Sequence, residues 1–305
     1  MRRVLSVHFA PCALFVAGVL ALVRAGSFSG RSDWGAVWPD RPEAALGVIL
    51  TVIVCAAFLG LLAQPFQVRA VRVLEGYWDR WFVTARLAEL LSRVQRRRQQ
   101  ALRRRAYGKG GGSAGVRVRA DARRRLAAYP PADVVMPTAL GNALRAGELS
   151  AGERYGLTTL TSWPRIFLQV SDRMSEVLRS TRDALDTAVN LCWALLALVG
   201  TGVYALYDEP ALWWWCGTGL VLAGGAYKGA VTAAQAYSGL MHVVYDLHRF
   251  DLLDALHYPL PTRADEEDTF AGISALFAGA ERPDLPYAHL VDRDSDARSG
   301  EGESA

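Results

Sequence analysis

Two side chains that can bind a metal or carry a proton lie four residues apart in the C-terminal third of the chain. They are His242 and Asp246, and the helical pattern around them places both on one helix face. A catalytic metal centre needs further His or carboxylate ligands from facing helices, and the long apolar segments of the chain contain no Asp or Glu. The pair is therefore a candidate for two metal ligands only. We expect it mainly to make polar contacts, with Arg249 pairing to Asp246 or to an acidic neighbour.

Motifs for other chemistry do not occur. The sequence has no G-x-S-x-G, H-E-x-x-H or dinucleotide-binding glycine motif. The glycine run at residues 108–115, GKGGGSAG, does not have the spacing of a phosphate-binding loop and follows no predicted strand, so it is interpreted as a flexible linker. The four cysteines form no C-x-x-C pair and lie in or beside apolar segments, which is typical of packing residues. We predict no catalytic residue, no enzyme activity and no cofactor.

Arginine supplies nearly all of the positive charge. Of 34 basic residues only Lys109 and Lys228 are lysines, and six arginines lie within residues 96–105, RRRQQALRRR. Three interpretations of this run are open: a solvated flank of a membrane segment, attraction to anionic lipid headgroups, and binding of nucleic acid or an acidic protein. Only Tyr107 and Tyr129 are near enough in sequence to stack on bases, so nucleic acid is an unfavoured partner.

The elements that must position these residues are apolar helices of membrane-spanning length. The 305 residues are 51% hydrophobic and 21% charged, with a mean hydropathy of +0.12, and the apolar residues collect in four segments. Each segment has about 20 residues, so as a helix it is roughly 30 Å long, the thickness of a hydrocarbon core. This pattern excludes a disordered chain, a disulfide-rich mini-protein and a simple soluble enzyme. The four segments are residues 4–23, 44–63, 187–206 and 211–231.

The distribution of charge predicts the orientation of these helices. Residues 65–185 contain 23 basic and 10 acidic residues, residues 24–43 contain three of each, and the turn at 207–210 has no basic residue. The positive-inside rule then places both termini and the central region of a multi-pass membrane protein in the cytoplasm. The first segment is interpreted as a retained helix, with a cleaved signal peptide as its alternative, and cleavage would not reverse the others.

A specific pattern lies in the central region, at residues 136–167. It reads MPTALGNALRAGELSAGERYGLTTLTSWPRIF, and it is accompanied by LEGYW at 74–78 and YDLHR at 245–249. The chain resembles an uncharacterised family of actinobacterial multi-pass membrane proteins with the segment L-P-T-x-L-G-N-x-L-R-A-x-E, then R-Y-G-L, then W-P-R. It departs from that pattern at the glutamate position, which falls on Gly147-Glu148. The resemblance implies a multi-pass protein in the cell membrane of a bacterium, and it implies no particular activity. The matching residues are Pro137, Thr138, Leu140, Gly141, Asn142, Leu144, Arg145, Ala146, Arg154, Tyr155, Gly156, Leu157, Trp163, Pro164 and Arg165.

The predicted fold is all-α: a polytopic membrane protein with four transmembrane helices, N-in and C-in, and long cytoplasmic helical extensions that pack as a bundle. Composition divides the chain into five regions. They are residues 1–64 with transmembrane helices 1 and 2, 65–185 as a basic cytoplasmic helical region, 186–231 with transmembrane helices 3 and 4, 232–282 as a cytoplasmic helical extension, and 283–305 as a disordered acidic tail.

The leading functional hypothesis is a non-enzymatic anchor, scaffold or regulator whose cytoplasmic bundle binds a protein partner or anionic lipid. The alternative is a homo-oligomeric pore, channel or membrane-perturbing effector. Gly225 and Gly229 form a G-x-x-x-G pair expected to favour close helix packing. The residues expected to contact a partner or lipid are Arg96, Arg97, Arg98, Arg103, Arg104, Arg105, Asn142, Arg145, Arg154, Tyr155, Trp163 and Arg165.

Overall fold

The architecture is described from a computed structural model, which covers residues 5–78, 82–108, 112–280 and 287. Within these residues every regular element is a helix and none is a strand, which confirms the all-α prediction. The chain forms two compact units. Unit 1 comprises residues 1–144 and 179–236, and unit 2 comprises residues 145–178 and 237–305. The predicted acidic tail at 283–305 lies outside the described residues, apart from Tyr287.

Within the residues that the structure describes, three helical segments are long and apolar enough to cross a membrane. The first is Val7–Arg24, which includes α2 (Ala10–Arg24). The second is Pro42–Glu75, where α3 (Pro42–Ala63) is joined to α4 (Gln67–Glu75) by a 3-10 turn containing Pro65. The third is Asp172–Ala205, the helix α9. Three of the four predicted apolar segments are thus confirmed as helices of membrane-crossing length and hydropathy.

The fourth predicted segment lies within α10 (Trp213–Ala255), a continuous helix of 43 residues. It is helical as expected, but it does not reach the hydropathy of the other three. Three successive tryptophans at 213–215, several glycines and Lys228 dilute its aliphatic residues. Hydropathy alone therefore does not mark this segment as a span.

Helices α9 and α10 pack closely within unit 1 at small residues. A Cβ atom at Gly219 would lie only 2.5 Å from Cγ2 of Val199, and one at Gly202 would lie 3.3 Å from Sγ of Cys216. Because the residue numbers on one helix rise as those on the other fall, the two helices run antiparallel. Small side chains at these positions allow the two backbones to approach.

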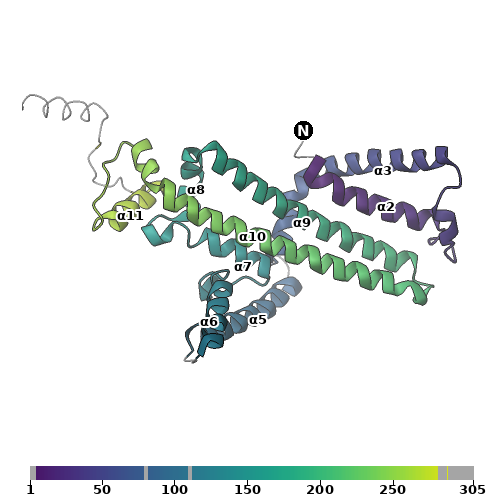
Figure 1. Cartoon of the computed structure of the whole chain (residues 1–305), viewed down its shortest axis with the longest axis horizontal. Coiled ribbons are helices and arrows are strands. Elements are labelled where there is room, and N and C mark those ends of the chain that lie inside the picture. Colours follow the sequence, from purple (N-terminus) through teal and green to yellow (C-terminus); the bar gives the residue numbers. More distant parts are fainter. Residues whose placement is uncertain (1–4, 79–81, 109–111, 281–286, 288–305) are drawn as a thin grey trace, which may run out of the picture. The chain divides into compact units, whose positions relative to one another are not determined.

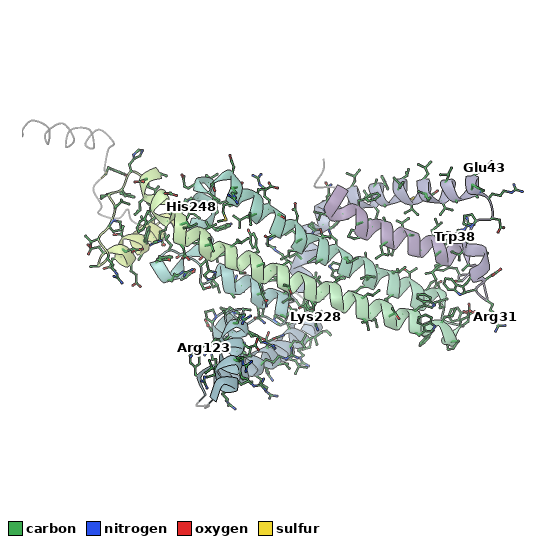
Figure 2. All side chains as sticks on the ribbon, in the orientation of Figure 1. Arg31, Trp38, Glu43, Arg123, Lys228 and His248 are labelled. Carbon is green, nitrogen blue, oxygen red and sulfur yellow. The ribbon has the colours of Figure 1, made fainter. Side chains whose placement is uncertain are left out.

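The loop between α2 and α3 is held by polar contacts within unit 1. The amide and the hydroxyl of Ser32 both donate to Oε1 of Glu209 at 2.6 Å, and Arg24 Nε donates to the carbonyl of Val37 at 3.2 Å. The hydrogen bonds from Ser32 lower the pKa of the Glu209 carboxyl. Figure 2 shows Arg31, Trp38 and Glu43 at this end of the helices.

The two helices that follow α4 form a helical hairpin. Helix α4 ends at Gly76, whose φ of +99° is the left-handed conformation that glycine adopts readily, so the helix stops within LEGYW. Helices α5 (Phe82–Tyr107) and α6 (Gly112–Leu126) then pack against each other (Figure 1). Helix α6 begins inside the predicted linker 108–115, because packing against α5 outweighs the poor helix propensity of glycine. Residues 109–111 of that linker lie outside the described residues.

Unit 2 has its own hydrophobic core. It contains α8 (Thr159–Ile166), α11 (Glu266–Phe277), the first turns of α9 and the last part of α10. The fully buried residues at its centre include Tyr245, Phe270, Leu157, Ile166 and Ile273. The core therefore brings the central segment together with the region that follows the apolar part of α10.

Candidate functional site

A charged cluster in unit 2 joins two motifs that are about 90 residues apart in the sequence. An amino group of Arg154 lies 3.1 Å from Oδ1 of Asp246, and the Tyr155 hydroxyl donates to the same oxygen at 2.6 Å. The Arg249 guanidinium lies 4.3 Å from the Tyr155 ring centre, and its Nε donates to Oε1 of Glu266 at 2.7 Å. Burial, followed by the hydrogen bond to Asp246, raises the pKa of Tyr155. The cluster thus holds the 153–157 segment to α10 and α11.

The candidate metal ligands His242 and Asp246 have separate partners. Nδ1 of His242 lies 2.8 Å from the carbonyl oxygen of Ser238, and its Nε2 lies 3.1 Å from Oγ of Ser150. Asp246 is engaged by Tyr155 and Arg154. Across residues 5–78, 82–108 and 112–280, no group of three or more His, Cys, Asp or Glu side chains is placed to hold a metal ion. The observed contacts of the pair join α10 to neighbouring segments of unit 2.

Three glycines of the central segment allow close approach to other elements of unit 2. A Cβ atom at Gly147 would lie 2.6 Å from Cβ of Ser238, and one at Gly152 would lie 2.8 Å from Cε1 of Tyr245. At Gly156 the φ is +83°, and a Cβ atom would lie 2.4 Å from the carbonyl oxygen of Glu267 on α11. These glycines therefore serve packing, and the one in R-Y-G-L meets both a conformational and a steric requirement.

Tyr245 lies at the centre of this packing and is fully buried. Its hydroxyl lies 2.8 Å from Oγ of Ser162 and donates to the carbonyl of Thr159 at 3.2 Å. Its ring centre lies 6.1 Å from that of Trp163, which packs against the same core. Trp163, expected to contact a partner, is therefore largely a core residue in this structure.

The stability of unit 2 is expected to fall at alkaline pH through Tyr245. Burial raises the pKa of Tyr245 to about 12, whereas an unfolded tyrosine titrates near 10. The folded state holds the tyrosine proton more tightly than the unfolded state does. The resulting contribution to the free energy of unfolding is therefore present below pH ~10 and is lost as the pH rises from ~10 through ~12. Thermal unfolding followed by near-UV circular dichroism between pH 8 and 11.5 measures this. The Tyr245→Phe variant should lose part of the alkaline decline, and an identical decline in both proteins would contradict the assignment.

The remaining central residues expected to contact a partner differ in exposure. Asn142 in unit 1 is 1% exposed, and its amide is used internally: Oδ1 accepts from the Met136 amide at 2.8 Å and Nδ2 donates to the Thr138 carbonyl at 2.8 Å. In unit 2, Arg145 lies 3.5 Å from Glu148, and the exposed Arg165 covers the Phe277 ring at 4.0 Å. Asn142 therefore shapes its own loop, whereas Arg165 lies on the surface.

The arginines of the 96–105 run are all exposed on α5. Two of them, Arg98 and Arg105, line a groove of about 510 Å³ together with Arg124 and Arg125 of α6. The sequence predicted a basic helix in this region as well, but only the run on α5 was expected to contact a partner or lipid. The structure thus combines two arginine-rich segments, separated by the hairpin turn, into one surface of unit 1.

The expected packing role of Gly225 and Gly229 is only partly visible within a single chain. A Cβ atom at Gly229 would lie 3.8 Å from Cβ of Ala188, an ordinary contact, and one at Gly225 would meet nothing within 4 Å. Of these glycines of α10, Gly219 has the closest contact with α9, 2.5 Å from a Cβ atom to Cγ2 of Val199, and it lies nearer the tryptophans. The surface at Gly225 is open in the described chain.

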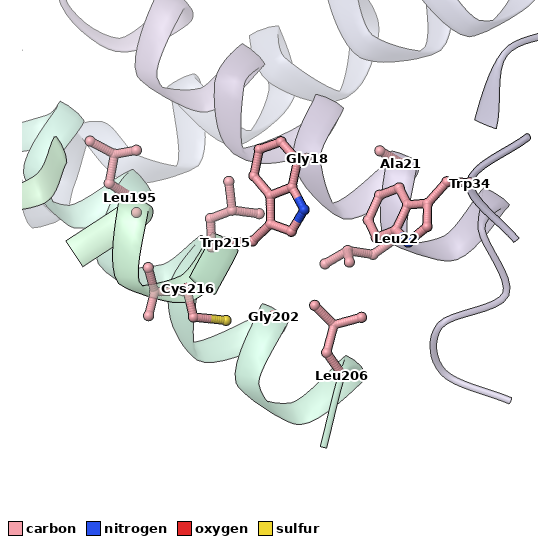
Figure 3. A pocket seen from close by; sticks show the side chains of 12 residues that line it. Gly18, Ala21, Leu22, Trp34, Leu195, Gly202, Leu206, Trp215 and Cys216 are labelled. Carbon is pink, nitrogen blue, oxygen red and sulfur yellow. The ribbon is translucent and has the colours of Figure 1, made fainter. Parts of the chain in front are cut away.

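An apolar pocket lies between α2, α9 and α10 in unit 1 (Figure 3). Its volume is about 210 Å³. Gly18, Gly202 and Gly219 line it, and the rings of Trp34 and Trp215 lie beside it. Its lining offers no charged side chain, and the Cys216 thiol is its one ionisable group, so the pocket suits a hydrocarbon chain.

No protein-family model, no curated protein and no solved structure matches the chain. The class of protein therefore follows from the fold and the site alone. Over the described part of the chain it is all-helical, with three helices long and apolar enough to cross a membrane, and its polar clusters there are largely paired within the protein.

Several important residues of unit 2 have no signature in the sequence. Glu153 accepts from both the amide and the hydroxyl of Thr159, and Glu266 pairs with Arg249. These carboxylates carry no local signal of their partners. The glycines do carry one, because Gly141, Gly147, Gly152 and Gly156 recur every four to six residues in a segment with apolar helical spacing.

Proposed function

We propose that the chain is an integral membrane protein that acts as a non-enzymatic scaffold or regulator and binds a protein partner through its cytoplasmic helices. The observation that supports this is an exposed apolar stripe on α5. Val83, Leu87, Leu90 and Val94 are 77%, 47%, 58% and 38% exposed and follow the spacing i, i+4, i+7, i+11. Such a stripe is the surface that a partner helix covers.

The proposed topology has four transmembrane helices with both termini in the cytoplasm. Helix α10 runs antiparallel to α9 and meets it at Gly202 and Gly219, so a membrane around α9 would surround this part of α10 as well. The loops at 24–43 and 207–210 have no excess of basic residues, whereas α5 and α6 are strongly basic. Both features favour α5 and α6 on the cytoplasmic side of a bacterial cell membrane.

The polar groups of unit 2 favour a structural role over catalysis. Arg154 with Asp246, Arg249 with Glu266, and Tyr245 with Ser162 satisfy one another. A catalytic site would be expected to keep a nucleophile or a base free to meet a substrate. We infer that this unit is a folded helical module and that its outer surface contributes to partner binding.

The test is the composition of the complex purified from host membranes in mild detergent, with stoichiometry by native mass spectrometry. A second protein at a fixed ratio supports the scaffold. In the double variant Leu87→Asp/Leu90→Asp, the amount of co-purified partner is expected to fall at least tenfold, because two charges would be buried in an apolar interface.

A matched control is Val116→Asp/Val118→Asp on α6, where the two valines are 57% and 56% exposed and lie outside the stripe. This control should keep the partner, and both double variants should retain the thermal stability of the unmodified protein. Equal loss of partner in the two variants would contradict the role of the α5 stripe.

The alternative proposal is a homo-oligomeric pore or membrane-perturbing effector. The exposed, uncontacted Gly225 on α10 favours it, since a second copy could approach closely there. A closed homo-oligomer without a second protein in the native mass spectrum would support this alternative. Ion or solute flux from liposomes containing the protein would then be measured.

A further inference from the structure

We propose that the groove between α5, α6 and α10 binds a phosphate group. Its walls include Arg98 and Arg105 of α5, Arg124 and Arg125 of α6, and Tyr129, with Gln235 of α10 at one edge. The groove lies within unit 1 and has a volume of about 510 Å³, enough for a phosphorylated headgroup. The inference rests on the membrane topology proposed above, and it deepens that proposal by naming a ligand class and its site.

The walls of the groove are fixed by buried amide side chains. Gln99 is 2% exposed and donates from Nε2 to the carbonyl of Pro130 at 2.8 Å. The hydroxyl of Tyr129 donates to Oε1 of Gln95, which is 7% exposed, at 2.9 Å. These two bonds tie the segment after α6 to α5, so the arginines of the two helices are held on a common surface.

The positive charge of this surface is largely uncompensated by the protein. Helices α5 and α6 together contain thirteen arginines and two carboxylates, Glu89 and Asp121. Those carboxylates pair with Arg93 and Arg125. In the part of the chain that the structure describes, no carboxylate lies within 4.0 Å of Arg98, Arg105 or Arg124.

Arginine is well matched to a phosphate. Its guanidinium presents paired N–H donors that bind two phosphate oxygens at once, and a phosphate would offset the repulsion among the four clustered cations. The Tyr129 ring and the side chains of Ala101 and Leu102 add apolar contact next to the charges. A ligand with a phosphate next to a hydrocarbon portion therefore fits the chemistry of the walls.

The position of the groove along α10 corresponds to a headgroup layer. Trp213 begins the helix, and the groove is lined by Val231 and Gln235, which lie 18 and 22 residues further on. At 1.5 Å per residue this distance is about 27–33 Å, the thickness of a hydrocarbon core. With the tryptophans at the outer interface, the groove lies at the level of the cytoplasmic phosphates. Lys228 of α10, labelled in Figure 2, is three residues before Val231.

The test is lipid binding to the full-length protein in detergent, measured by native mass spectrometry with phosphatidic acid and, as a zwitterionic reference, phosphatidylcholine. Arg98→Gln/Arg124→Gln is expected to lower the affinity for phosphatidic acid about tenfold or more. Arg98→Lys/Arg124→Lys keeps the charge but loses the paired donors, so a several-fold loss is expected. The control is Arg117→Gln/Arg123→Gln, which removes two exposed arginines of α6 that do not line the groove, and should change the affinity less than about twofold.

A second measurement, competition with soluble glycerol 3-phosphate, distinguishes a lipid phosphate from a free phosphate as the ligand. If soluble glycerol 3-phosphate binds and competes with phosphatidic acid, and Arg98→Gln/Arg124→Gln weakens both, the groove takes free phosphates as well as lipids. If the groove and control variants lose equal affinity, or neither loses any, the proposal is overturned. Retention of groove-dependent binding in the Leu87→Asp/Leu90→Asp protein, or in a protein that purifies without a partner, would separate this site from the scaffold function.

Discussion

Replacing Gly156 by alanine is expected to lower the free energy of unfolding of unit 2 by about 2–5 kcal/mol. Its φ of +83° disfavours any residue with a Cβ atom, at a cost of about 1–2 kcal/mol. The new methyl group would also lie 2.4 Å from the carbonyl oxygen of Glu267 and 3.1 Å from the amide nitrogen of Ala271. Backbone atoms of α11 cannot rotate away, so the helix must shift, which adds about 1–3 kcal/mol.

Hydrogen-exchange mass spectrometry of the full-length protein in detergent reports this loss as faster exchange in residues 150–170 and 240–277. The control is Gly279→Ala. Gly279 has nearly the same φ, +85°, but a Cβ atom there would meet nothing within 4 Å, so only the conformational cost of about 1–2 kcal/mol is expected. If the two variants lose equal stability, α11 does not approach Gly156 closely enough to resist a methyl group.

The all-α class and three of the membrane-length helices could be predicted because they depend on local composition. Runs of Leu, Val and Ala in residues 4–23, 44–63 and 187–206 produce a signal that does not depend on distant residues. The segment at 211–231 differs because Trp213 to Trp215, glycines and Lys228 lower its hydropathy. Its packing against α9 is a tertiary contact, of which the glycines in both helices are only an indirect sign.

The interruption at Gly76 shows where local reasoning is incomplete. The apolar spacing around LEGYW is helical, but the helix ends at Gly76 in a left-handed turn that lies against a distant part of the chain. A Cβ atom at Gly76 would lie 2.9 Å from Cδ of Pro137, a residue 61 positions away. A contact of that sequence separation has no signature in a helical pattern.

The residues of the candidate site could be predicted by their type, but their partners and the surfaces that they face could not. Arg154 and Tyr155 stand out in the sequence, yet their partner Asp246 and the neighbouring Glu266 belong to segments that only the tertiary structure brings near. Trp163 shows the same limit, since an aromatic side chain that can bind a partner can equally pack against Tyr245. The arginine groove requires α5 and α6 to fold back on each other, which depends on the hairpin and not on either helix alone.

Replacing Tyr245 by alanine is expected to destabilise unit 2 by about 3–5 kcal/mol, as is usual for removal of a buried aromatic ring. The ring is fully buried among Trp163, Gly152 and the core of unit 2, so its loss leaves a cavity that α8 and α10 cannot close without moving. Tyr245→Phe keeps the ring and removes only the hydroxyl, with an expected cost of about 0.5–1.5 kcal/mol.

The contrast between these two variants tests whether the R-Y-G-L and Y-D-L-H-R segments share one core. Chemical unfolding followed by near-UV circular dichroism gives both differences, and the alanine variant should also expose Trp163 to a water-soluble quencher. Domains commonly have about 5–15 kcal/mol of stability, so a loss of about 3–5 kcal/mol removes a large share and should reduce any partner binding that needs a folded unit 2. A Tyr245→Ala protein as stable as Tyr245→Phe, with Trp163 still protected, would mean that the two segments are joined mainly by the Arg154–Asp246 and Arg249–Glu266 ion pairs and not by the buried ring.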